Sequence, residues 1–257
     1  MSSPTHAPPT TARIPVGDAT LYVESSGAGE PLLLLHGFTG CGRDWQYAGR
    51  EQLRPGHRLI VPDARGHGLS DNPGGAFDHR RCAHDALALL DALGIDHCRA
   101  IGLSLGGNTL LHMCTLQPTR IRAMVIVSAT PRLPEQARAL MRATDADGLP
   151  PAELARLEAA HPRGEAQIRA LLDIQRGFAD SHDDLCFTAA TLGRIRARTL
   201  IVQGDRDPLY PIELSVELYR GIPDAALSVV PGGGHLPVFL EQAPAFVGMA
   251  RRFLAAD

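Results

Sequence analysis

Residues 102–106 read Gly-Leu-Ser-Leu-Gly, and this short stretch decides the fold. A strand-like run at 97–101 precedes it, and a helix-like run that ends before Pro118 follows it. Between a strand and a helix, the pattern G-x-S-x-G is typical of a nucleophile elbow, a tight turn that strains the serine backbone. Only a small residue fits two positions before and two positions after the serine, which explains Gly102 and Gly106. We therefore expect the Ser104 hydroxyl to project from the sheet at a helix N-terminus, where negative charge is stabilised.

Strand-like and helix-like runs alternate along most of the chain. Two short runs, 13–16 and 20–24, predict a hairpin joined at Gly17-Asp18. Apolar runs at 31–35, 58–61 and 124–127 predict strands that are buried in the sheet. Further strands are predicted at 97–101, 199–202 and 227–230. Helices are expected at about 44–53, 78–93, 108–113, 212–219 and 239–254. The alternation predicts an α/β fold, with a mostly parallel eight-stranded sheet covered by helices on both faces.

One region breaks this alternation. Residues 131–192 contain no β-like run and predict helical pieces at 134–143, 151–160, 164–178 and 184–192. Ligands of open α/β sheets bind beyond the carboxyl ends of the strands, so we expect these helices to form a cap over Ser104. The predicted organisation is a core domain of residues 12–130 and 193–257, a cap of residues 131–192, and a disordered, Ser/Thr/Pro-rich lead of residues 1–11.

Composition excludes several classes of function. All 25 basic residues are arginine and the net charge is −3, so neither Schiff-base lysine chemistry nor a nucleic-acid partner is expected. No apolar run reaches the ~20 residues that span a membrane, and the N-terminus lacks a signal-peptide core. The five cysteines form no C-x-x-C pair, so no metal site is expected. We expect a cytoplasmic protein that acts on a small molecule, with the choice between monomer and homodimer open.

An activated serine needs a base and an acid. Asp207 follows the 199–202 strand in Gly204-Asp205-Arg206-Asp207, and His235 follows the 227–230 strand after three glycines. The order Ser104, Asp207, His235 is that of serine enzymes with a nucleophile elbow. Asp205 competes with Asp207 as the acid, and a solvated surface residue is the alternative interpretation of the histidine.

The negative charge of an acyl-transfer intermediate needs two backbone N–H donors. Leu105 at the start of the elbow helix is one candidate, and Phe38 in the loop after the 31–35 strand is the other. His36, in the same loop, is expected to brace it rather than to bind a metal. We expect the substrate pocket to be mostly apolar and to include the following residues: Thr39, Ser128, Leu209 and Leu236.

Together these pieces resemble the α/β-hydrolase fold family from about residue 12 to 255. The matching motifs are His36-Gly37-Phe38, Asp63-Ala64-Arg65-Gly66-His67-Gly68-Leu69-Ser70, Gly102–Gly107, Gly204–Asp207 with Pro211, and Gly234-His235. The resemblance implies a helical lid at 131–192 and places the acid at Asp207. Haloalkane dehalogenases and epoxide hydrolases of this fold use an aspartate at the elbow, so Ser104 argues against both.

The resemblance implies a serine hydrolase without a cofactor, and hydrolysis of a carboxylic ester or lactone is the first expectation. The elbow also resembles those of enol-lactonases, carbon–carbon bond hydrolases and cofactor-free haloperoxidases (perhydrolases). A carbon–carbon hydrolase must hold a dienol carboxylate, for which Arg132, Arg138 and Arg142 are candidates, although a solvated arginine face is the alternative. Thioester hydrolysis, transfer to another acceptor and a non-catalytic small-molecule receptor stay open.

Overall fold

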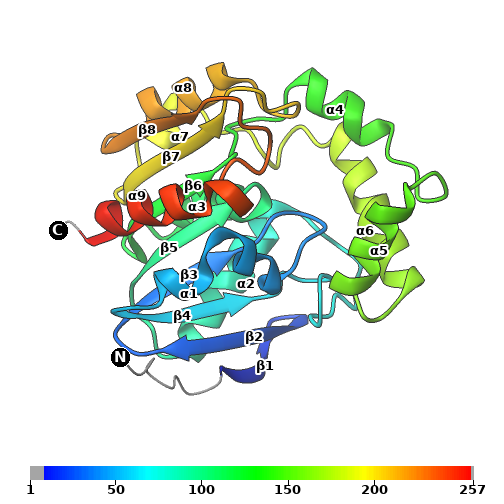
Figure 1. Cartoon of the computed structure of the whole chain (residues 1–257), viewed down its shortest axis with the longest axis horizontal. Helices are drawn as coiled ribbons and strands as arrows, with labels where there is room; N and C mark the ends of the chain where they lie inside the picture. The colour runs from blue at the N-terminus through cyan, green and yellow to red at the C-terminus, as the bar shows by residue number, and fades with distance from the viewer. Residues whose placement is uncertain (1–8, 256–257) are drawn as a thin grey trace.

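The computed structural model describes residues 9–255, and its core is an eight-stranded sheet with the order β1-β2-β4-β3-β5-β6-β7-β8 (Figure 1). β1 and β2 form the predicted hairpin, and β2 runs antiparallel to β4. The remaining six strands, in the sheet order β4-β3-β5-β6-β7-β8, are mutually parallel. The predicted, mostly parallel sheet is therefore confirmed. The strands are β1 (Thr10–Val16), β2 (Ala19–Gly27), β3 (Glu30–Leu35), β4 (His57–Pro62), β5 (Cys98–Leu103), β6 (Ile121–Val127), β7 (Arg198–Gly204) and β8 (Ala225–Val230).

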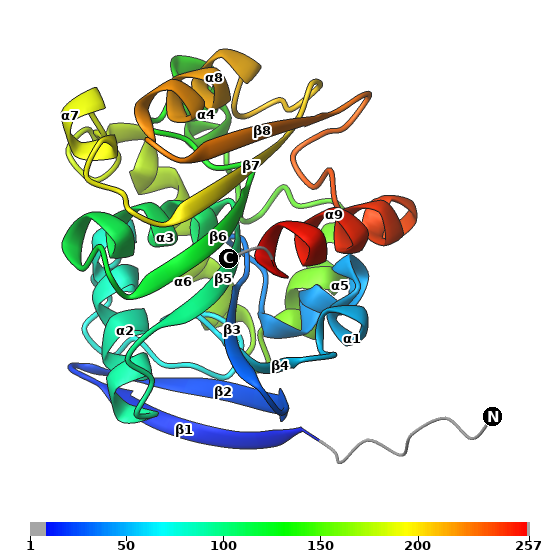
Figure 2. The same ribbon diagram turned by 90° about the vertical axis from the view of Figure 1, so that its left-hand side faces the viewer.

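Helices cover both faces of this sheet (Figure 2). One face carries α2 (His79–Ala92), α3 (Leu105–Leu116) and α8 (Ile212–Gly221), and the other carries η1 (Gly42–Ala48), α1 (Arg50–Leu53) and α9 (Ala243–Ala255). Successive side chains of a strand point to opposite faces. Leu33 accordingly packs in one apolar cluster while Leu32 and Leu34 pack in the other, and all three are fully buried.

The chain between β6 and β7 is helical, as expected for residues 131–192. It contains α4 (Glu135–Arg142), α5 (Pro151–Ala160), α6 (Glu165–Gly177), the short η2 (Phe178–Asp180) and α7 (Ala189–Leu192). In Figure 1, α4, α5 and α6 stand to the right of the sheet, clear of the helices on its two faces. We call residues 131–192 the insertion.

Two predicted boundaries at the N-terminal end need correction. β1 begins at Thr10, which pairs with Ser25, so residues 10 and 11 belong to the sheet and not to a disordered lead. Residues 1–8 of that predicted lead lie outside the described residues. The single helix predicted at 44–53 is broken by Gly49, whose φ of +79° ends η1 before α1 begins.

The last predicted piece of the insertion is also shorter than expected. Only residues 189–192 are helical, because the preceding residues make other contacts. The Asp184 carboxylate accepts the backbone N–H groups of His79 and Arg80 at the start of α2, and Cys186 forms a β-bridge with Arg132. None of the helices within residues 9–255 is long and apolar enough to cross a membrane.

Candidate active site

Ser104 occupies the turn that the sequence predicts between β5 and α3. Its φ of 49° and ψ of −108° lie outside the common backbone regions, and its N–H donates to the Val127 carbonyl at 2.8 Å. A Cβ on Gly102 would lie 2.4 Å from the Gly106 carbonyl oxygen, and a Cβ on Gly106 would lie 2.1 Å from that of Leu35. Both glycines are thus required sterically, because this strained turn is packed directly against the sheet.

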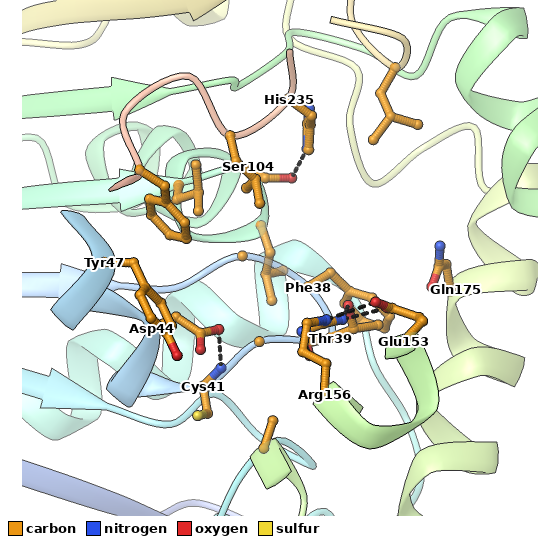
Figure 3. Close-up of a pocket in the computed structure, with 18 of the residues that line it drawn as sticks. Phe38, Thr39, Cys41, Asp44, Tyr47, Ser104, Glu153, Arg156, Gln175 and His235 are labelled. Carbon is orange, nitrogen blue, oxygen red and sulfur yellow. Dashed lines mark hydrogen bonds and ion pairs between the residues drawn. The ribbon is translucent and has the colours of Figure 1, made fainter. Parts of the chain in front are cut away.

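His235 and Asp207 reach Ser104 from the same edge of the sheet, since Ser104 follows β5, Asp207 follows β7 and His235 follows β8. His235 Nε2 lies 2.9 Å from Ser104 Oγ (Figure 3). On the other side of the ring, His235 Nδ1 lies 2.8 Å from Asp207 Oδ2. A Cβ at Gly204 would come within 2.3 Å of two carbonyl oxygens in the loop before His235. The glycine at the end of β7 therefore lets the histidine loop pass close enough to reach the serine.

The Asp207 carboxylate is buried and its hydrogen-bonding capacity is filled. Oδ1 accepts the backbone N–H groups of Leu209 and Tyr210, and Oδ2 accepts the Gln203 amide at 2.9 Å as well as His235. Burial alone would raise the pKa of Asp207, but the bonds from His235 and the two amides lower it below its ordinary value. Asp205, the competing acid, is exposed.

The four backbone amides that follow Phe38 are all hydrogen-bonded. The N–H groups of Thr39, Gly40, Cys41 and Gly42 donate to His67, Gly37, Asp44 and Asp63 respectively. Neither Phe38 N–H nor Leu105 N–H, in the first turn of α3, has an acceptor among the described residues. His36 braces the loop: its Nδ1 donates to the Gly37 carbonyl at 2.7 Å and its Nε2 accepts the Ala64 N–H at 2.9 Å.

Ser104 and His235 face a cavity of about 810 Å³ between the core and the insertion (Figure 3). Most of its wall is apolar, which suits a medium-sized hydrophobic ligand. The core contributes Phe38, Tyr47, Leu103, Leu105, Leu209, Tyr210, Leu236, Phe239 and Leu240, and the insertion contributes Leu140, Met141, Ala159, Ala160, Gln175 and Phe178.

The two arginines that line this cavity already have partners. Arg156 donates to both carboxylate oxygens of Glu153, at 2.7 and 2.9 Å, and Arg43 donates to the Ala159 carbonyl. The three arginines that the sequence offered for binding a carboxylate do not line the cavity. Arg132 pairs with Glu217, Arg142 pairs with Glu135, and the buried Arg138 donates to backbone carbonyls of residues 133, 178 and 179.

The structure separates the four residues that were predicted to bind substrate. Thr39, Leu209 and Leu236 line the cavity. Ser128, at the end of β6, is fully buried and is not part of the cavity wall, so its side chain does not reach the space beside Ser104. Ser128 follows directly after β6, and a place at the end of a strand does not fix the direction in which a side chain points.

Sequence reasoning missed four residues that shape the site. Gln203 and Tyr210 hold the acid, and Tyr210 also packs edge-on against the His235 ring, with ring centroids 5.2 Å apart. Arg156 and His161 of the insertion bind Thr39. The position of Gln203, four residues before Asp207 on β7, was a usable signal for the first. No local pattern points to Arg156 or His161, because their partner lies more than 100 residues away.

Comparison with known proteins agrees with this geometry. Residues 32–249 match the model of the alpha/beta hydrolase family. A 2-hydroxymuconate semialdehyde hydrolase from Pseudomonas putida is 28% identical, with 99% of this chain and 98% of that protein covered.

Two solved structures show likeness of fold. The A129V mutant of the meta-cleavage product hydrolase CumD gives a TM-score of 0.77 at 24% identity, over 95% of this chain and 97% of that one. Est816, described as an N-acyl homoserine lactone degrading enzyme, gives 0.71 at 24% identity, over 94% and 100%. With the sheet order, the elbow and the family match together, the chain belongs to the alpha/beta hydrolase family.

Proposed function

We propose that this protein is a serine hydrolase that cleaves a carboxylic ester or lactone through a covalent acyl-enzyme. One observation carries the proposal: hydrogen bonds run from the strained Ser104 through His235 to the buried Asp207. In this role Ser104 is the nucleophile and His235 is the general base. Asp207 orients the imidazole and stabilises the imidazolium that forms.

The reaction takes two steps. Ser104 Oγ attacks the carbonyl carbon while His235 Nε2 takes the hydroxyl proton, and His235 then gives this proton to the leaving alcohol as the C–O bond breaks. Next, His235 removes a proton from water, whose oxygen attacks the acyl carbon. Collapse of the second intermediate returns the proton to Ser104 and releases the acid. Side chains, amides and water suffice, so the proposal includes no cofactor and no metal.

The tetrahedral intermediates carry a negative oxygen. We propose that Phe38 N–H and Leu105 N–H form the oxyanion hole, supported by their lack of other acceptors and by their position beside Ser104. Each such donor contributes about 3 to 4 kcal/mol to transition-state stabilisation in a well-formed site.

The cavity wall supports a mainly hydrophobic ester or lactone as the substrate. Its apolar side chains favour an apolar acyl or alcohol group, and both lining arginines have partners that reduce their attraction for a substrate carboxylate. The insertion supplies part of this wall, so we propose that residues 131–192 serve as the lid of the site. Thr39, Leu209 and Leu236 are the proposed substrate contacts.

Hydrolysis of a carbon–carbon bond is the second candidate. It is favoured by the relative named as a 2-hydroxymuconate semialdehyde hydrolase, which matches almost the whole chain. A muconate-type substrate carries a carboxylate, and such a group needs a cation within reach. Arg132, Arg138 and Arg142 do not line the cavity. The two arginines that do are already engaged, Arg156 by the Glu153 carboxylate and Arg43 by the Ala159 carbonyl, so the cavity favours the ester or lactone.

Substrate profiling separates these candidates. p-Nitrophenyl esters from acetate to decanoate, aliphatic lactones and 2-hydroxymuconate semialdehyde are tested with the wild type and with Ser104→Ala. We expect turnover of at least one ester or lactone, and a loss of at least about 10⁴-fold in the variant. Turnover of the semialdehyde alone would select the second candidate. No turnover of any compound would contradict the hydrolase proposal.

A further inference from the structure

Thr39 has a backbone conformation that its residue type disfavours. Its φ is +59°, and a β-branched residue rarely adopts a positive φ. The Gly40 N–H donates to the Gly37 carbonyl at 3.1 Å, so residues 37–40 form a β-turn with Thr39 at the third position. A positive φ at that position belongs to a type II turn and normally calls for glycine. Something outside the turn must therefore hold Thr39 in place.

Hydrogen bonds restrain every polar group of Thr39. Its N–H donates to His67 Nε2 in the core at 3.3 Å. Its carbonyl oxygen accepts Arg156 Nη1 and His161 Nε2, both at 3.1 Å, and its Oγ1 accepts Arg156 Nη2 at 3.1 Å. Figure 3 shows Arg156 reaching Thr39 from α5. Three of these four bonds come from the insertion, and we call Arg156 and His161 the Thr39 clamp.

Both members of the clamp are themselves oriented. Glu153, one turn earlier on α5, binds the Arg156 guanidinium through both carboxylate oxygens. The His161 ring is fully buried at the end of α5, and its Nδ1 accepts the Gly68 N–H at 3.0 Å. This leaves the ring proton on Nε2, directed at the Thr39 carbonyl. The clamp is thus a set of contacts with fixed donors.

We propose that Arg156 and His161 are positioning residues that set the Phe38 amide of the oxyanion hole by holding Thr39 at positive φ. The inference rests on the proposed function and extends it, because it makes the insertion part of the catalytic geometry. If the clamp is lost, Thr39 relaxes toward the type I turn that non-glycine residues prefer. The peptide between Phe38 and Thr39 then turns over, which breaks the Thr39 N–H bond to His67. With that bond lost, the loop no longer holds the neighbouring Phe38 N–H firmly at the oxyanion position.

The test compares Arg156→Gln with Arg169→Gln. Arg169 is an equally exposed arginine of the insertion, but its ion pairs with Glu165 and Asp147 stay within the insertion. We expect Arg156→Gln to lower kcat about ten- to hundredfold with KM within about twofold, and Arg169→Gln to change neither. Binding of a trifluoromethyl ketone, whose adduct on Ser104 carries the same oxyanion, should weaken by the same factor as kcat/KM. A change in KM alone, or equal losses in both variants, would overturn the proposal.

His161 offers a rescue experiment. His161→Phe removes both bonds of the ring, whereas His161→Gln keeps one donor and one acceptor, so kcat should fall in the first and largely recover in the second. If the thermal midpoint of His161→Phe shows that it does not fold, Arg156→Gln decides alone. Hydrogen exchange of residues 36–42 adds a readout that needs no substrate. It should speed up in Arg156→Gln and stay unchanged in Arg169→Gln, and equal exchange would refute the clamp.

These outcomes separate the two proposals. A wild-type protein that turns over no ester or lactone, and does not react at Ser104, refutes the proposed function and with it any oxyanion role of the clamp. An active wild type whose kcat is the same in Arg156→Gln refutes only the clamp.

Discussion

Ser104 and Thr39 both have a positive φ, 49° and 59°, yet two different kinds of structure hold them. At Ser104 the restraint is local, since Gly102 and Gly106 pack so closely that neither can carry a Cβ. At Thr39 the restraint is remote, since side chains 117 and 122 residues away bind its polar groups. The core half of the site is therefore determined by short motifs. The half around Phe38 depends on how the insertion sits on the core.

The largest effect is expected in the core half. Asp207→Asn should lower kcat about 10⁴-fold, because an amide that donates to His235 Nδ1 turns the ring proton toward Ser104, where a base is needed. Steady-state ester hydrolysis measures this loss. The exposed neighbour supplies the control: Asp205→Asn should keep wild-type kcat. A loss below about tenfold in Asp207→Asn would show that this carboxylate does not support His235.

A second substitution breaks the local restraint itself. Gly106→Ala would place a Cβ 2.1 Å from the Leu35 carbonyl oxygen, so β3 and α3 must move apart. We expect the free energy of unfolding to fall by about 3 kcal/mol, measured by urea denaturation. Gly177→Ala is the matched control, since a Cβ there meets nothing within 4 Å. Equal stabilities of the two variants would mean that the elbow is not tightly packed.

Acid should weaken the half of the site that depends on the insertion. Burial, the largest cause, lowers the pKa of His161 from 6.5 to about 4, and burial lowers the pKa of His67 as well. The unfolded chain binds these protons at a higher pH than the folded protein does. The contribution of the two histidines to the free energy of unfolding is therefore fully present above pH 6.5 and is lost as the pH falls toward 4. His161 alone contributes roughly 3 kcal/mol of this change.

Urea denaturation at a series of pH values measures the effect. His161→Gln should show a shallower loss of stability between pH 6.5 and 4 than the wild type does. His67 and His112 keep part of the slope in that variant, since burial lowers the pKa of His112 to about 4 as well. An identical slope in the two proteins would show that burial does not lower the pKa of His161 in the folded protein.

The smallest effect is expected at Thr39. Glycine adopts a positive φ without strain, so Thr39→Gly should change the free energy of unfolding by less than about 1 kcal/mol. Thr39→Gly should also make the turn less dependent on the clamp. Arg156→Gln should therefore lower kcat by a smaller factor in the Thr39→Gly background than in the wild type. A double-mutant cycle measures this coupling. A cycle without coupling would mean that the two residues act independently.

Much of the core half could be predicted because its information is local. Apolar runs located the parallel strands, and the spacing of glycines around Ser104, Asp207 and His235 reflects clashes that the structure confirms at Gly102 and Gly204. Ser128 was misplaced because the end of a strand fixes a residue's position along the sheet but not the direction of its side chain.

The insertion half could not be predicted in the same way. Helical periodicity located α4, α5 and α6, but periodicity does not say which residues of a helix touch a loop more than 100 positions earlier. Arg156, in the middle of α5, and His161, directly after it, look like ordinary polar residues of a helix. Their role is visible only because Thr39, a residue unsuited to positive φ, lies opposite them.

The central claim is that Ser104 is an activated nucleophile, and labelling tests it most directly. The wild type and Ser104→Ala are incubated with a fluorophosphonate, and intact-protein mass with peptide mapping locates the adduct. The account predicts one adduct per chain on Ser104 in the wild type and none in the variant. An unlabelled wild type, or a label that persists in Ser104→Ala, would contradict it.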